Sequence, residues 1–162
     1  MSSPREPRWK EILTERLPER AGDIEGLMSD APDRLVAELR DDPDMTRALV
    51  EADARHVLEK WFSPRAEETV VFTDGRVGAV GDQDAGAEWV FAGHHDQAEV
   101  FRGLPATGRP VEVHGFTVVA TGTDEEGRPI PVFTRHIDWA GLYAQLGLTI
   151  NWRVPLDPEP DG

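Results

Sequence analysis

The chain is 162 residues long, contains no cysteine and carries a formal net charge of −14, with 39% hydrophobic and 30% charged residues. This composition suits one globular domain, and it excludes disulfides, thiol catalysis and thiolate metal sites. The acidic balance argues against a nucleic-acid partner, which clustered Lys and Arg side chains would bind, and no apolar run reaches the ~20 residues that a membrane-spanning helix needs.

The N-terminal third of the sequence predicts helices. Residues 1–22 are rich in charge and proline, and we expect a flexible or helical arm there. They lack the apolar stretch of a secretory signal, which together with the absence of cysteine favours a cytoplasmic protein. Two short amphipathic pieces, "DIEGLM" and "DRLVAELR", follow. A longer helix is predicted at 45–62, with Asp44 placed to cap its first turn and an apolar stripe facing a core.

The sequence after residue 67 is typical of β structure. "ETVVF" and "RVGAV" are short runs on either side of Asp74–Gly75, which predicts a hairpin turn. Next come a loop ("GDQDAG"), a strand ("AEWVFAGHHD"), an irregular segment ("FRGLPATGRP"), a long strand ("VEVHGFTVVATG"), a turn ("DEEGR") and a last strand ("PIPVFTRHI"). Because helices come first and a curved antiparallel sheet second, we predict an α+β fold, with one domain over 23–153 and a disordered acidic tail over 154–162.

Strand alternation assigns the candidate histidines to faces. His95 shares a face with Trp89 and Phe91, so it is either a base or substrate donor in a pocket or a packed core residue. His114 shares a face with Phe116, where it would polarise a substrate carbonyl or be covered by a neighbouring chain.

In the last strand, alternation sends Arg135 to one face and His136 to the other. Only one of the two can easily line a pocket. The remaining candidate from the histidine-rich stretches, His94, should point away from His95. No HxH or HxxxH spacing occurs, and adjacent strand residues face opposite ways, so we expect no metal. P-loop, dinucleotide-binding and GxSxG motifs are absent as well.

Asp138 has two interpretations. It precedes a short helix at 139–146 and sits where an N-cap belongs, and Gly147 sits where a C′ glycine belongs. A cap needs only a short side-chain acceptor. The alternative is a carboxylate in a pocket, where burial among aromatic side chains would raise the pKa of a carboxylic acid toward the range that proton abstraction needs.

Three pieces of the C-terminal half occur in a recognisable order: Gly93-His94-His95, then "FRGLPATGR" from Phe101 to Arg109, then the Asp138–Gly147 stretch. Over about residues 66–150 the chain resembles the SnoaL-like polyketide cyclases, a branch of the nuclear-transport-factor-two-like cone fold. The resemblance implies a conical half-barrel closed by N-terminal helices and a deep pocket for a hydrophobic, polyketide-derived molecule. It also implies no metal or organic cofactor, and a homo-oligomer, a dimer or tetramer, paired through the sheet.

The resemblance further implies cyclisation by acid–base chemistry next to a carbonyl, in the lyase or isomerase class. Asp138 would be the acid/base, His95 and His114 would stabilise the oxyanion or orient the substrate, and Arg135 would be a charge partner. The expected substrate contacts are Trp89, Phe91, Phe116, His136 and Trp139. The chain departs from the family in placing Arg135 about where an acid is usual. Two alternatives therefore stay open: an epoxide hydrolase or dehydratase that activates water, and a non-catalytic small-molecule-binding protein.

Overall fold

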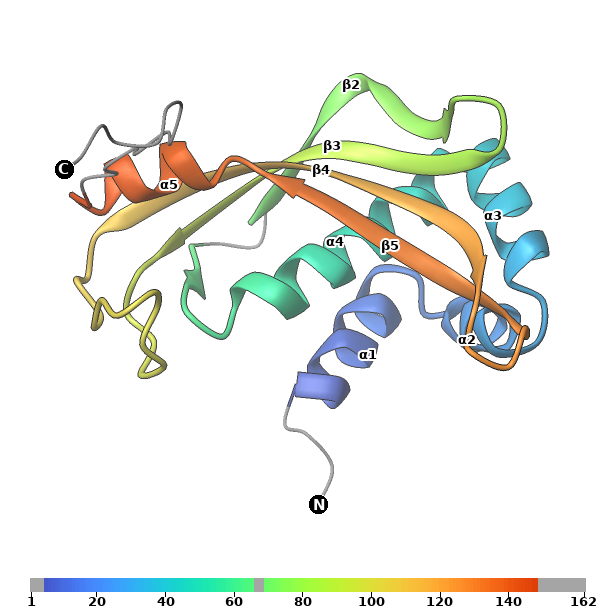
Figure 1. The fold of residues 1–162 in the computed structure, drawn as a ribbon, viewed down its shortest axis with the longest axis horizontal. Helices are drawn as coiled ribbons and strands as arrows, with labels where there is room; N and C mark the ends of the chain where they lie inside the picture. Colours follow the sequence, from blue (N-terminus) through green and yellow to red (C-terminus); the bar gives the residue numbers. More distant parts are fainter. Residues whose placement is uncertain (1–4, 66–68, 149–162) are drawn as a thin grey trace, which may run out of the picture.

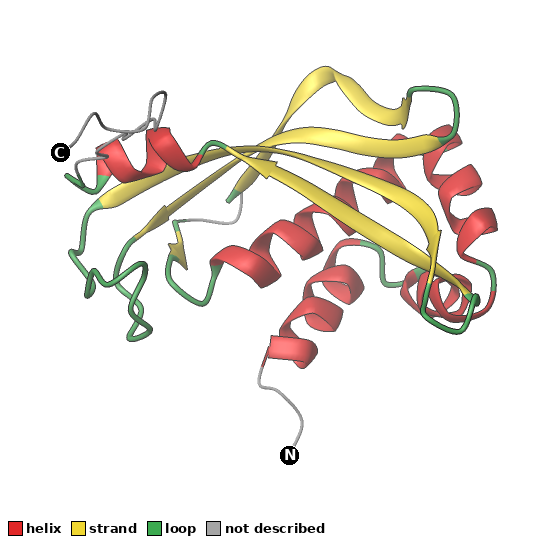
Figure 2. Cartoon of the chain, in the orientation of Figure 1, coloured by secondary structure: helices red, strands yellow, loops and turns green. Residues whose placement is uncertain are grey.

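The computed structural model describes residues 5–65 and 69–148. Four helices precede the sheet: α1 (Arg5–Arg16), α2 (Ala21–Asp30), α3 (Pro32–Asp41) and α4 (Pro43–Leu58). The sheet contains β1 (Ser63–Pro64), β2 (Val70–Val80), β3 (Asp84–His94), β4 (Pro110–Thr123) and β5 (Pro129–Ile137), and α5 (Trp139–Gln145) follows. The predicted α+β fold is confirmed: a curled antiparallel sheet forms a half-barrel over the N-terminal helices (Figures 1 and 2).

The sheet wraps around α4. β3 pairs with β2 and β1 on one side and with β4 on the other, and β5 lies beyond β4. α4 packs on the concave face, α1 packs on α4 from below, and α3 contacts the sheet at the end opposite α5 (Figure 1). The tail over 154–162 lies outside the described residues.

Strand alternation divides the side chains as the sequence predicts. In β4 the odd-numbered residues Val111 to Val119 are buried, whereas Glu112 and His114 are exposed. The inner face of β3 carries two large apolar side chains, Trp89 and Phe91, which pack toward α4. α1 contributes Ile12 and Leu13 to the core, so this part of the N-terminal arm is a packed helix.

Two local predictions are wrong. Asp74–Gly75 does not turn the chain, because β2 continues through it with a register shift between Phe72 and Val77. Both halves pair with the same partner, β3, and the hairpin turn comes later, around Gly81, whose φ is +63°. Pairing with β3 on both sides of an irregular stretch, residues 73–76, thus keeps the chain in one strand despite the local turn signal.

The second correction concerns the start and end of α4. Its N-cap is Asp42, whose carboxylate accepts from the Met45 N–H at 3.2 Å, and Pro43 occupies the first helical position. Asp44 lies inside the first turn and pairs with Arg47 instead. The helix also ends at Leu58 and does not continue to residue 62.

α5 closes one end of the sheet through a side-chain amide. The Glu112 N–H donates to Gln145 Oε1 at 2.6 Å, and Gln145 Nε2 donates to the Glu112 carbonyl at 2.8 Å. These bonds fall on the stretch of β4 that extends past the last β5 pair, Gly115↔Ile137. α5 is therefore docked on the end of β4.

Candidate functional site

Asp138 is the N-cap of α5, as one of its two sequence interpretations predicts. Its carboxylate accepts from the Gly141 N–H at 3.0 Å, and the side chain is exposed. Gly141 leaves room for this contact, because an added Cβ would lie 2.4 Å from a carboxylate oxygen of Asp138. Gly147 ends the helix with a φ of +77°. The capping geometry places this carboxylate at the surface of the molecule.

The concave face of the sheet holds Trp89 and Phe91, both fully buried. The register pairs Trp89 with Gly115, and the indole lies across that glycine so that its Nε1–H donates to Thr117 Oγ1 at 2.8 Å. A Cβ on Gly115 would approach the indole to 2.3 Å. The polar tip of the tryptophan is thus satisfied inside the core.

Arg135 points into the half-barrel and pairs with Asp53 of α4. Its Nε and Nη2 donate to the two carboxylate oxygens at 2.7 and 2.6 Å. The Asp53 side chain is 5% exposed and that of Arg135 34%. The hydrogen bond that Arg135 donates to Asp53 raises the pKa of Arg135 above its ordinary value, against the opposing effect of burial. Asp53 was missed in the sequence; the available signal was a carboxylate between two alanines inside a helix.

His95 is buried at the end of β3. Its ring lies near Phe62 and Phe101, with centroids 5.5 and 6.2 Å away. Nδ1 contacts Thr107, whereas Nε2 is buried without a hydrogen-bond partner. Burial lowers the pKa of His95 from its ordinary value, although the neighbouring charge of Asp96 acts to raise it.

The other predicted site residues lie elsewhere. His114, Phe116 and His136 are on the outer face of the sheet, where Phe116 and His136 are directly paired and His114 lies 3.8 Å from Glu112. Trp139 lies on α5 and stacks on Phe101 at a centroid distance of 6.1 Å. The structure thus gathers Trp89, Phe91, His95 and Arg135 on the concave side of the sheet and separates them from the outward-facing set.

A cleft of about 530 Å³ opens between α1, α4 and the start of β2. It is lined by Arg16, Leu17, Asp44, Arg47, Ala48, Glu51, Val70, Val71 and Phe72. None of the residues proposed from the sequence lines it. The cleft is lined by segments that are far apart in the sequence, so no local sequence pattern could predict it.

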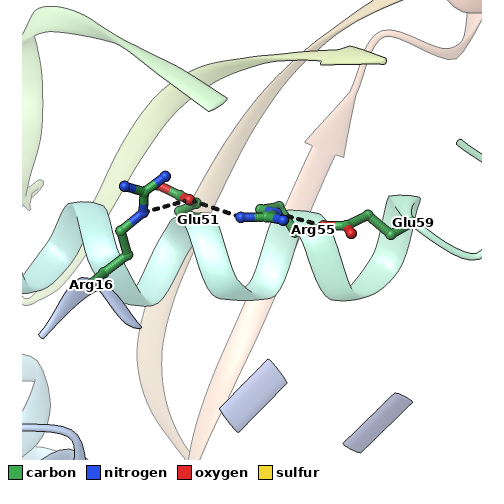
Figure 3. Close-up of polar contacts among 4 residues, drawn as sticks. All are labelled: Arg16, Glu51, Arg55 and Glu59. Atoms are coloured by element: carbon green, nitrogen blue, oxygen red, sulfur yellow. Dashed lines mark hydrogen bonds and ion pairs between the residues drawn. The ribbon is translucent and has the colours of Figure 1, made fainter. Parts of the chain in front are cut away.

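A line of alternating charges runs from this cleft along α4 (Figure 3). Glu51 Oε2 accepts from Arg16 Nε at 2.9 Å and lies 3.4 Å from Arg55 Nη1, and Arg55 Nε also donates to Glu59. Burial acts to lower the pKa of Arg55, but its hydrogen bond to Glu59 and the charges of both glutamates raise it overall. Glu51, on the cleft wall, is thus held between two guanidinium groups.

Two further properties follow from the described ranges, 5–65 and 69–148. They contain no group of three histidine or carboxylate side chains arranged to hold a metal ion. None of their helices combines the length and the apolar character needed to cross a bilayer.

Comparison with known proteins gives one distant structural likeness. No family model matches the sequence, and no curated protein matches it. Among solved structures, TsrD from Streptomyces laurentii is similar to this chain with a TM-score of 0.39 and 20% sequence identity, over 85% of this chain and 96% of that one.

Proposed function

We propose that this chain is a small-molecule-binding protein on a SnoaL-like half-barrel, and that it takes an amphipathic ligand between α1, α4 and β2. The observation that carries the proposal is the cleft of about 530 Å³, which joins an apolar wall to two guanidinium groups and the carboxylates paired with them. Small-molecule sites are typically concave spaces of roughly 300–1,000 Å³ with a few polar groups in a mainly apolar lining.

The apolar and polar parts of the cleft have different roles. Leu17, Ala48 and Phe72 would bury the ligand's carbon skeleton, which supplies most of the binding free energy. Arg47 is 42% exposed and its partner Asp44 is 83% exposed, so this ion pair contributes little stability. Exchanging Asp44 for a ligand carbonyl or carboxylate therefore costs little, and Arg47 would orient the ligand.

The test is a binding screen with polycyclic ketones and aromatic carboxylic acids, read by thermal shift and then by calorimetry. We expect Arg47→Ala to weaken binding of a carboxylate-bearing hit about tenfold, which corresponds to the roughly 1.5 kcal/mol of a charge-assisted hydrogen bond. Arg34→Ala removes the same charge from an exposed position of α3 outside the cleft and should leave the dissociation constant unchanged. Equal weakening by both variants, or no hit in the panel, would contradict the proposal.

The second candidate is the acid–base enzyme expected from the family resemblance. The Asp53–Arg135 pair favours it, because a buried carboxylate beside a partly exposed guanidinium is an arrangement that can activate water or stabilise an oxyanion. Asp138 is a weaker candidate, since at an exposed helix start bulk water competes for the proton that it would transfer. This version fits the epoxide hydrolase or dehydratase alternative better than the cyclase.

Mass spectrometry of ligands incubated with matched variants distinguishes these roles. For the enzyme, wild type and Asp138→Asn should convert the ligand, and Asp53→Asn should not. If only Asp138→Asn fails to convert the ligand, Asp138 is the catalytic acid/base and Asp53 is not. Binding without conversion by wild type would leave the binding protein as the function.

We further propose that the chain forms a homo-oligomer through the outer face of the sheet. Val132 is 37% exposed there, and the half-buried Phe116 and Val118 lie on the same face of the neighbouring strand β4. Light scattering on a sizing column should give a dimer or tetramer that Val132→Lys dissociates, whereas Val100→Lys, at a valine that is 54% exposed and outside the sheet, leaves it intact. A monomeric wild type would contradict this.

A further inference from the structure

His95 lies at the start of the segment between β3 and β4 and is hydrogen-bonded to the end of that segment. The His95 N–H donates to the Arg109 carbonyl at 2.8 Å, and the Gly108 N–H donates to the His95 carbonyl at 2.7 Å. The imidazole adds a third attachment, because Nδ1 lies 3.3 Å from the Thr107 backbone nitrogen and 3.0 Å from the Thr107 hydroxyl. One residue thus holds both ends of the segment.

The contact with the Thr107 backbone N–H requires a neutral imidazole. A backbone N–H can only donate, so Nδ1 accepts its bond and carries no proton. The Thr107 hydroxyl accepts from the Arg109 N–H at 3.2 Å and donates to Nδ1 of the neutral ring, whereas a protonated ring would donate to it instead. The ring proton therefore resides on Nε2. Protonating Nδ1 would place its N–H opposite the Thr107 N–H, and the hydrogen bond between Thr107 N–H and the ring would be lost.

The segment also contains an aromatic residue of the core, Phe101. Phe101 is fully buried, and a short bridge to Leu104 holds it in place. Its ring lies 4.9 Å from that of Trp61 and 6.0 Å from that of Tyr143. It therefore joins the chain just after α4 to α5, at the end of the sheet that carries α5 (Figure 1).

We propose that His95 is a proton-operated latch: protonation of its ring breaks the bond from the Thr107 N–H and leaves a charge buried between Phe62 and Phe101, which favours release of residues 96–108 and of Phe101 from the end of the half-barrel. The groups packed on the ring are Phe62 from the α4–β1 connection and Phe101 and Thr107 from the segment itself, none of which titrates. Among the described residues, the charge acting on the ring is that of Asp96, which favours protonation. The latch does not depend on the cleft beside α1.

The direction of the pH response follows from linkage. Burial lowers the pKa of His95 in the latched state, whereas a released ring regains an ordinary pKa of about 6.5. Latching is therefore fully supported above pH ~6.5 and weakens below it. The opening equilibrium should increase by up to about tenfold per pH unit until the latched ring itself titrates.

Hydrogen exchange measured by mass spectrometry between pH 7.5 and 5 tests the latch in the full chain. After correction for intrinsic exchange rates, we expect peptides covering 96–108 to lose protection below pH ~6.5, while β4 peptides keep theirs. His95→Asn places an amide oxygen near the Nδ1 position and cannot take up a proton, so its segment should stay protected. His94→Asn, on the opposite face of β3, should respond as wild type does.

A ring titration of His95 by NMR in wild type gives a second readout that needs no variant. Its midpoint should lie below pH ~6.5, the pH at which protection begins to fall, and its nitrogen shifts should show the Nε2–H tautomer above the midpoint. The latch is overturned by unchanged protection down to pH 5, by a His95→Asn response equal to that of wild type, or by loss of the transition in His94→Asn.

Discussion

At the scale of single residues, Gly115 shows how one missing methyl group sets the inner face of the sheet. The indole of Trp89 occupies the space where a Cβ would stand, and from there it reaches Thr117. No positive φ requires glycine at this position, so the constraint is close approach alone. The shape of the concave face next to Arg135 therefore depends on this glycine.

Gly115→Ala should destabilise the fold by about 1–3 kcal/mol, because the Cβ would displace a fully buried ring and strain the Trp89–Thr117 hydrogen bond. Denaturant unfolding measures this. Gly122→Ala is the matched control in the same strand. Its Cβ would meet only a methyl group of the partly exposed Val132, which can move, so the change should stay within about 0.5 kcal/mol. Equal losses in both variants would show that β4 simply disfavours alanine.

At the scale of elements, the Asp53–Arg135 pair joins α4 to β5 across 82 positions of sequence. Pairing of β5 with β4 fixes the strand in the sheet, and the ion pair connects that strand to the helix. Breaking one partner leaves a buried charge without compensation, which costs more than the net contribution of the pair.

A double-mutant cycle with Asp53→Asn and Arg135→Gln should give a coupling energy of about 1–2 kcal/mol in urea unfolding, below the value for a fully buried pair because Arg135 is partly exposed. The exposed Asp44–Arg47 pair serves as the control cycle, with expected coupling under about 0.5 kcal/mol. Coupling no larger than that of the control would mean that solvent screens both pairs alike.

The elements also show what the sequence could predict. Periodicity and alternation located the helices before the sheet and the faces of β3, β4 and β5, and they offered the Asp138 cap as one of two interpretations, since each of these is a local property. The Asp74–Gly75 turn failed because pairing with β3 outweighs a local preference. The cleft and the Asp53–Arg135 pair could not be predicted, because their partners meet only after the sheet curls over α4.

At the scale of the whole molecule, the excess of acidic residues sets the long-range electrostatic interactions. A net charge of −14 on a chain of this size opposes the compact state through self-repulsion, and the described arginines are largely engaged locally, as in the Arg16–Glu51–Arg55–Glu59 line. Mobile ions screen repulsion between distant surface charges more than they weaken close, partly buried pairs.

Raising sodium chloride from 20 mM to 300 mM should therefore increase the melting temperature at pH 7.5, as measured by calorimetry. A similar rise with an uncharged osmolyte at equal osmolality would attribute the effect to solvent exclusion. A fall in melting temperature would mean that the close ion pairs, which salt also weakens, contribute more to stability than long-range repulsion subtracts from it.

The docking of Gln145 on β4 covers a strand edge on which other molecules could pair. Past its last pair with β5, β4 would present bare backbone donors and acceptors, the template on which strands of different molecules add to one another. The Gln145 amide supplies one donor and one acceptor to Glu112, as a neighbouring strand residue would, and so occupies that edge with a single side chain. Glutamate at this position would keep the acceptor and lose the donor, leaving the edge open to fibre-like growth.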